Sequence, residues 1–308
     1  MDKTKRGIAL FITLLVIASI LSIVAVSFSY LQKVQKDAGK VSALIQGNLL
    51  YKNTTEILKK FFPKGKVDSK KLKTIYTLPL MLSEPKSGFN INLQCKPLLT
   101  AIPIEWLNKD FTKKTPQKLD LAKDTLSKII QKYEIKEPNH FEELILGEID
   151  GTTDRDNEYK PRLKQKKNSI SKKQFNRLLL EYRLKYDDTN VFNVPWEKYF
   201  LFVTVSKKDT IDGEYITPEL ISIIFDIPID SVNDSWNIDT DIKETKLTLK
   251  EFLRENGNLE LFDKKLYSEK ALNAIHCEEV YAYRDIYYSF SFDYKDERNK
   301  NFEFNGER

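Results

Sequence analysis

The residues best suited to chemistry in this chain lie in an acidic segment near its middle. Asp150, Asp154, Asp156 and Glu158 place four carboxylates around Gly151. Spaced carboxylates on a flexible loop are the hard oxygen ligands that Ca²⁺ binds, at about 2.3 to 2.6 Å. The segment does not match an EF-hand, and acidic runs are commonly solvated loops. The pattern therefore leaves two interpretations open, a calcium site or an ordinary acidic loop.

A basic segment follows the acidic one. Residues 160–173 contain seven lysines or arginines and no acid. Binding of single-stranded nucleic acid favours aromatic side chains interleaved with cations, and nucleic-acid binding in general favours a broad basic face; neither is present here. The whole chain carries a formal charge of only +5, from 50 basic and 45 acidic residues. We therefore interpret this segment as a solvated loop and expect no nucleic-acid partner.

Histidines and nucleophiles give no indication of an enzyme. His140 and His276 are the two histidines of the chain, and they do not have the spacing of metal ligands. We interpret His140 as a helix-start residue and His276 as a packing residue. The sequence contains neither a nucleophile elbow nor a phosphate-binding glycine loop. We expect no enzymatic activity, and no cofactor other than calcium.

The two cysteines, Cys95 and Cys277, admit two states. In an oxidising compartment they can form a disulfide, and closing so long a loop contributes at most about 4 to 5 kcal/mol in the chain-entropy model. Two cysteines define no disulfide framework, so two separate buried thiols are the alternative.

The chain begins with a membrane-spanning pattern. Residues 7–32 contain no charged side chain, and a helix of this length reaches about 39 Å, enough to cross a hydrocarbon layer of about 30 Å. Lys3, Lys5 and Arg6 precede the segment, which places the N-terminus in the cytoplasm and the rest of the chain outside it. A signal peptide cleaved near residues 25–27 is an alternative with an unusually long apolar region, and a plain single-pass anchor is another.

The helical pattern continues beyond the apolar segment. Apolar residues recur every three or four positions at Leu31, Val34, Ala38, Val41, Ile45 and Leu49. Proline first appears at Pro63, so we predict one continuous helix from about Ile8 to about Phe62. The stripe is expected to pack the outer half of this helix on the soluble domain of the same chain.

The remaining patterns predict an α+β fold. Strands over 75–82 and 88–95 and aromatic strands over 285–294 and 301–304 are expected to form one antiparallel sheet packed on the long helix. Between them, helices are predicted over 118–133, 139–146, 172–186, 218–225 and 247–255, with a strand over 198–206. The predicted architecture is a long transmembrane and amphipathic helix, a small antiparallel sheet, and a large inserted, mainly helical domain.

The start of the apolar segment resembles a processing site. The run Lys-Arg-Gly-Ile-Ala-Leu-Phe-Ile-Thr-Leu-Leu, from Lys5 to Leu15, is similar to the leader junction of type IV pilin-like proteins. The resemblance implies that a prepilin peptidase cuts between Gly7 and Ile8 and methylates the new N-terminus. Most pilins carry Glu at the fifth mature position, where this chain has Ile12. The K-type minor pseudopilins of type II secretion lack that Glu too, and have a large soluble domain.

Other segments extend the resemblance to the K-type family. Gly88–Leu93 resembles its Gly-x-Ile-Asn-Leu-Asn strand, and Ile211–Leu220 resembles the short loop before its last helical units. The family's Asp-Trp-Ile-Asp-x-Asp calcium loop aligns with residues 147–152, where Asp150 is the one matching acid. The implied domains are a leader (1–7), a transmembrane helix (8–31), the outer helix with the first strands (32–99), an inserted helical domain (100–275) and the C-terminal strands (276–308).

The resemblance also implies a function. It is that of a minor pseudopilin at the tip of a type II secretion pseudopilus, which helps to initiate filament assembly for protein export. The implied partners are other minor pseudopilins, bound through N-terminal helices, in the bacterial inner membrane with the soluble domain in the periplasm. A minor pilin of a type IV pilus or DNA-uptake pseudopilus is an alternative, as is a generic anchored periplasmic binding domain.

Overall fold

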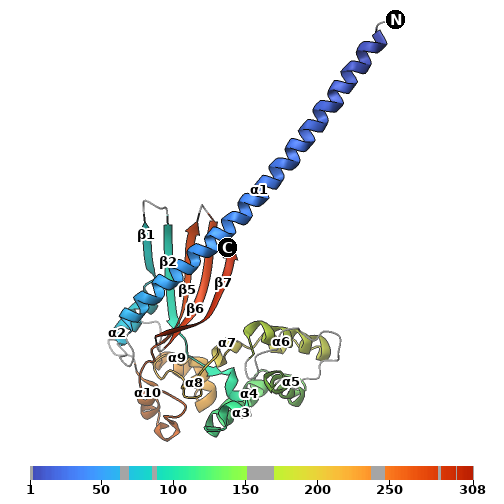
Figure 1. Cartoon of the computed structure of the whole chain (residues 1–308). Helices are drawn as coiled ribbons and strands as arrows, with labels where there is room; N and C mark the ends of the chain where they lie inside the picture. The colour runs from blue at the N-terminus through green and yellow to red at the C-terminus, as the bar shows by residue number, and fades with distance from the viewer. Residues whose placement is uncertain are drawn as a thin grey trace.

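One helix sets the length of the molecule. In the computed structural model, α1 runs unbroken over Lys3–Phe61, and its 59 residues correspond to about 88 Å (Figure 1). The model describes residues 3–62, 69–84, 89–150, 170–236, 247–283, 286–295 and 297–307. Within these ranges α1 is the one helix long and apolar enough to cross a membrane by length and composition. The predicted continuous helix is confirmed.

A five-stranded antiparallel sheet packs against the C-terminal half of α1. Its strands follow the order β1-β2-β5-β6-β7, so that β5 lies at the centre and β1 and β7 at the edges. Their bounds are β1 Leu80–Glu84, β2 Phe89–Pro97, β5 Ala274–Tyr283, β6 Ile286–Lys295 and β7 Arg298–Glu307. The α+β architecture and the pairing of early with late strands agree with the prediction.

Alternation along the strands decides which face of the sheet meets α1. On β6 the aromatic residues Tyr288, Phe290, Phe292 and Tyr294 occupy every second position and are buried, as expected for the face of a strand that packs on a core. Ser289 and Asp293 on the other face of β6 are buried as well. On β5 the buried series is Ile275, Cys277, Glu279 and Tyr281. The members of these two series, Glu279 apart, belong to one core cluster with Ala43 and Leu58 of α1 and with Phe62, which directly follows α1.

Two predicted strands are helical in part. Ile75–Thr77 was expected to open the first strand, but it belongs to helix α2 (Ser69–Thr77), because Leu72 and Ile75 are buried at a helical spacing of three. Residues 198–206 were expected to form a strand. Instead Trp196–Tyr199 forms α7, and only Phe200–Leu201 is extended, as β4, which pairs in parallel with β3 (Ile102–Pro103).

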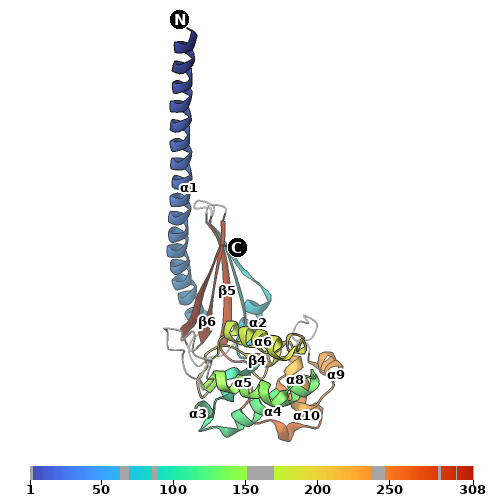
Figure 2. The same ribbon diagram turned by 90° about the vertical axis from the view of Figure 1, so that its right-hand side faces the viewer.

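A block of short helices lies between β2 and β5 in the sequence. Both views place it at the end of the sheet away from the N-terminus (Figures 1 and 2). Its helices are α3 Lys109–Thr112, α4 Pro116–Lys132, α5 Pro138–Asp150, α6 Lys172–Tyr186, α7, α8 Pro218–Phe225, α9 Ile229–Ser235 and α10 Leu249–Glu255, with 3₁₀ turns at Ile104–Leu107, Asn190–Phe192 and Leu259–Leu261. The predicted bounds of α6 and α8 agree with the structure to the residue.

The block has its own apolar core and is tied to the sheet at one buried carboxylate. Its core includes Trp106, Phe141, Tyr182 and Phe252. Asp212 Oδ2 accepts a hydrogen bond from the Leu272 amide at 2.8 Å, just before β5 begins. The amide of Asp212 donates to the carbonyl of Leu99 at 2.8 Å, just after β2 ends. Asp212 therefore joins the two chain segments that connect sheet and block.

Candidate functional site: the outer half of α1

The part of α1 beyond its most apolar segment has two apolar faces on opposite sides. The face toward the sheet contains Ala43, Gly47, Thr54, Leu58 and Phe62, which are buried. Residues 43 and 45 differ by about 200° around the helix, at about 100° per residue. The residue set that includes Ile45 therefore points away from the sheet.

We call this second set the exposed stripe; it consists of Val34, Ala38, Val41, Ile45 and Leu49. The periodicity of these residues predicts that they pack on the chain's own soluble domain, and this prediction is wrong. Val41 is 60% exposed and Ile45 56% exposed. The reason is that the sheet occupies the opposite side, where Gly47 and Ala43 allow a closer approach than branched side chains would.

The exposed stripe ends at Leu49, and charged residues follow it on the same side of α1. After Leu49 the same side of the helix carries Lys52, Glu56 and Lys59, and Glu56 forms an ion pair with Lys59 at 2.8 Å. The stripe thus extends about 27 Å beyond Leu31 at about 1.5 Å per residue. An apolar strip that continues directly from a segment long and apolar enough to span a membrane is suited to side-by-side contact with another helix.

Hydrogen bonds from the sheet fix the rotation of α1. The Tyr281 hydroxyl donates to the carbonyl of Ala43, and that of Tyr294 donates to the carbonyl of Phe62 at 3.3 Å. The Asn299 side-chain amide donates to the Thr55 hydroxyl. Because these contacts lie along the helix from Ala43 to Phe62, they determine which side of α1 remains open.

A buried carboxyl group lies at the centre of this interface. Glu279 on β5 is fully buried, and its Oε2 accepts a hydrogen bond from the Thr54 hydroxyl of α1 at 2.7 Å. Among the described residues nothing lies within hydrogen-bonding distance of Oε1. Burial raises the pKa of Glu279 to about 7, against the lowering effect of the Thr54 hydrogen bond. Glu279 was not predicted from the sequence, where its only signal is an acid at an apolar position of an alternating strand.

The two cysteines meet on neighbouring strands. Cys95 of β2 and Cys277 of β5 are register partners and form a disulfide. Of the two states that the sequence leaves open, the structure contains the disulfide. Both cysteines belong to the core cluster beneath α1 and are buried.

The predicted processing residues lie in α1, and only one of the predicted calcium ligands lies among the described residues. Gly7 and Ile8 lie within α1, where the structure describes their backbone. Asp150 ends α5, while Asp154, Asp156 and Glu158 lie outside the described residues. The described residues contain no group of three or more metal-ligating side chains. Three of the four proposed calcium ligands thus lie outside the part of the chain that the structure describes, and calcium stays a prediction.

Both histidines serve local structure. His276 Nδ1 lies 2.7 Å from Asp293 Oδ1 across neighbouring strands, on the side of the sheet away from α1, and Asn301 donates to the other carboxylate oxygen of Asp293 at 2.6 Å. His140 lies in the first turn of α5, and its ring stacks on Tyr186 at 5.9 Å. These contacts agree with the packing and helix-start roles expected from the sequence.

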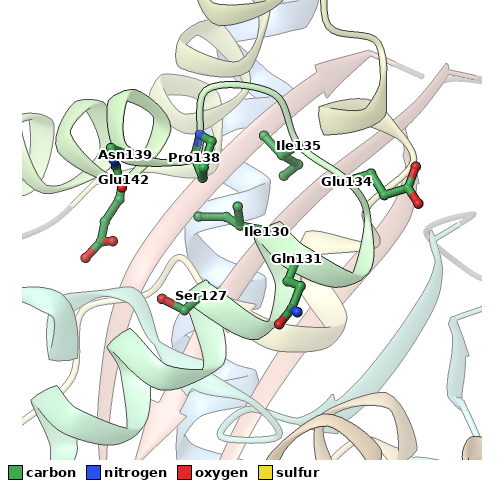
Figure 3. A pocket seen from close by; sticks show the side chains of 8 residues that line it. All are labelled: Ser127, Ile130, Gln131, Glu134, Ile135, Pro138, Asn139 and Glu142. Carbon is green, nitrogen blue, oxygen red and sulfur yellow. The ribbon is translucent and has the colours of Figure 1, made fainter.

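A shallow groove lies on the helical block at the corner between α4 and α5. It has a volume of about 300 Å³ and is drawn in Figure 3. Ile130, Ile135, Glu134 and Glu142 are among the residues that line it. The described residues that line it include no histidine, cysteine or cation.

The chain has a structural likeness to a protein of known structure. No family model matches the chain, and no curated protein matches it in sequence. A chain in the crystal structure of the GspK-GspI-GspJ complex of the type 2 secretion system from enterotoxigenic Escherichia coli is similar in structure, with a TM-score of 0.49 and 10% sequence identity. The match covers 87% of this chain and 98% of that chain.

Proposed function

We propose that this protein is a membrane-anchored, pilin-like subunit that assembles side by side with similar subunits, as a minor pseudopilin of a type II secretion system. The observation that carries the proposal is the exposed stripe of α1. It continues the membrane-spanning segment on the side that the chain's own sheet does not cover. A neighbouring membrane-anchored helix has the length and apolar character to cover it.

The resemblance at the leader junction supports processing between Gly7 and Ile8. After cleavage at that bond the apolar segment starts directly at the new N-terminus, without the cations Lys3, Lys5 and Arg6. A helix freed of these charges can be drawn further through the bilayer, since a charged side chain at bilayer depth costs several kcal/mol. The proposed role is mechanical assembly without catalytic turnover.

The helical block supports a place at the tip of the filament. Its α5 and α6 reach beyond the edge strand β7 (Figure 1). A block of this size on every subunit would overlap with the neighbours of a tightly packed filament, whereas one copy at the end meets no such overlap. Ile12 at the fifth mature position is consistent with an end subunit, since no following subunit needs a carboxylate there.

N-terminal sequencing of the protein from membranes of its own host tests the processing step. A mature chain that begins at Ile8, and a Gly7→Ala variant that retains residues 1–7, are the expected results. A chain that begins at Met1 in cells with an active prepilin peptidase contradicts the proposal. A chain that begins at Phe28 would instead indicate a secreted protein.

The assembly step needs a second test, because processing alone does not show contact. Val41→Lys with Ile45→Lys should abolish co-purification of other membrane-anchored subunits, since two charges would enter an apolar helix contact. Both side chains are exposed, so the stability of the subunit itself should change little. Asn53→Lys, at an exposed position outside the stripe, is the matched control and should leave co-purification intact.

A further inference from the structure

Helix α6 presents leucines to solvent on the face opposite its core contacts. Its buried residues are Phe175, Leu178, Leu179 and Tyr182. On the other side, Leu180 is 47% exposed and Leu184 is 77% exposed. These two leucines are four residues apart and therefore neighbours on the helix surface. Packing within the helical block does not explain Leu180 and Leu184, because other residues of α6 already form its contacts with the core.

Cations extend and flank this apolar pair. Lys173 and Arg177 precede Leu180 on the same side of the helix and are exposed. Arg183 lies beside it with its guanidinium 5.7 Å from the ring of Phe192, which is itself exposed. We call Lys173, Arg177, Leu180 and Leu184 the α6 ridge. Helix α6 has five basic residues against the single acid Glu181, so its charge favours an acidic partner.

The position of α6 limits what can reach the ridge. Both views place α6 on the side of the helical block that faces the N-terminal end of α1 (Figures 1 and 2). Since its buried side faces the block, the ridge faces the space beside β7 and the outer half of α1. A membrane surface does not reach this space, because Leu31 and the end of α1 are about 45 Å apart while charge is screened over about 8 Å at physiological salt.

We propose that the α6 ridge docks the soluble domain of the neighbouring subunit whose N-terminal helix packs on the exposed stripe of α1. That domain would meet the ridge with an apolar surface rimmed by carboxylates. The inference rests on the proposed function and adds a second contact to it. The two contacts together would fix the rotation of the neighbouring subunit and its position along the axis of α1. A contact between the two helices alone would leave the neighbour free to slide along that axis.

Site-specific photocrosslinking of the full chain in its host membranes tests the proposal. A benzophenone amino acid is placed at Leu184, at Val41 in the exposed stripe, or at Lys113, an exposed control position at the C-terminal end of α3. Helix α3 lies on the side of the block opposite to α6 (Figures 1 and 2). Mass spectrometry then identifies each product. The expected result is one membrane-anchored protein captured from both Leu184 and Val41 and not from Lys113. Arg177→Glu should lower the yield from Leu184 roughly tenfold, since like charges would face each other, and should leave the yield from Val41 unchanged.

The outcomes separate the two proposals. Capture at Val41 without capture at Leu184 would overturn the α6 docking while leaving the proposed function intact. Capture of lipid or of a second copy of this chain at Leu184 would also overturn it, as would a yield from Leu184 that Arg177→Glu does not change. Absence of any capture at Val41 would contradict the proposed function itself.

Discussion

The hydroxyl group of Tyr281 lies against the backbone of α1 at Gly47, in space that any other residue would fill. A Cβ atom at position 47 would stand 2.8 Å from this hydroxyl oxygen, which donates its hydrogen bond to the carbonyl of Ala43. Glycine therefore allows the central strand of the sheet to approach the helix closely. The sequence shows only a residue that weakens a helix by up to about 1 kcal/mol.

Two glycines of α1 should respond oppositely to the same substitution. Gly47→Ala displaces Tyr281 and should destabilise the fold by about 1 to 3 kcal/mol, the usual cost of overpacking. Gly39→Ala has nothing within 4 Å of its new methyl group and should stabilise the helix by up to about 1 kcal/mol. Urea denaturation of the detergent-solubilised protein measures both. Equal effects at the two positions would contradict the close approach.

Stability should fall as the pH rises toward neutrality because of Glu279. Its pKa is raised from the ordinary value of 4.5 to about 7 by burial. The folded state therefore binds the proton more tightly than the unfolded state, and the free energy of unfolding decreases between about pH 4.5 and 7. The full effect is roughly 3 kcal/mol.

Glu279→Gln should remove this pH dependence while its side-chain carbonyl still accepts from Thr54. Denaturation curves from pH 4 to 8 provide the measurement. Glu303→Gln, on an exposed part of β7, is the control and should retain the slope of the unmodified protein. A slope that Glu279→Gln leaves unchanged would show that another group is responsible.

Asp212 should control how firmly the helical block is held to the sheet. Its carboxylate accepts from the amides of Glu214 at 2.8 Å, Tyr215 at 3.2 Å and Leu272 at 2.8 Å. Asp212→Ala leaves these donors without that acceptor and should cost about 3 kcal/mol or more, at about 1 to 3 kcal/mol per buried group. Hydrogen exchange should accelerate at Leu272 and Tyr215 before it does in β6. Uniform acceleration across the chain would instead indicate global destabilisation.

The disulfide should resist labelling until it is reduced. In denaturant without reductant, neither Cys95 nor Cys277 should react with a maleimide, and both should react after reduction. Cys95→Ser with Cys277→Ser should lower stability by at most about 5 kcal/mol, because the bond closes a loop of 182 residues in the chain-entropy model. Labelling of both thiols without reductant would mean that the native protein does not contain the bond.

Calcium, predicted from Asp150, Asp154, Asp156 and Glu158, should raise the melting temperature. A ligand that binds only the folded state stabilises it in proportion to the logarithm of its concentration. A chelator should therefore lower the melting temperature, and Asp154→Asn with Asp156→Asn should abolish the difference. Identical melting curves with calcium and with chelator would favour the solvated acidic loop.

Sequence periodicity predicts elements well where one face is uniformly apolar. The bounds of α6 follow from its spacing and from the capping box of Ser171 and Gln174. The strand β5 escaped prediction because Glu279 occupies one of its core positions and hides the alternation. The face of α1 that meets the sheet was not predicted for a similar reason. Gly47 and Thr54 on that face are less apolar than Val41 and Ile45 on the open side. Residues whose role is close backbone approach or hydrogen bonding are not apolar, so a hydropathy pattern does not identify them as buried.

The bond between Cys95 and Cys277 also determines what happens to a cut chain. The segment between them contains the whole helical block, so the block is a covalently closed ring whose two ends meet at adjacent strands. A protease that nicks any loop of this ring leaves both fragments joined to α1. Tension applied through α1 reaches the sheet and this crosslink before it reaches the helices. A pulling force on α1 is therefore transmitted through the sheet and the disulfide, and the helical block does not bear it.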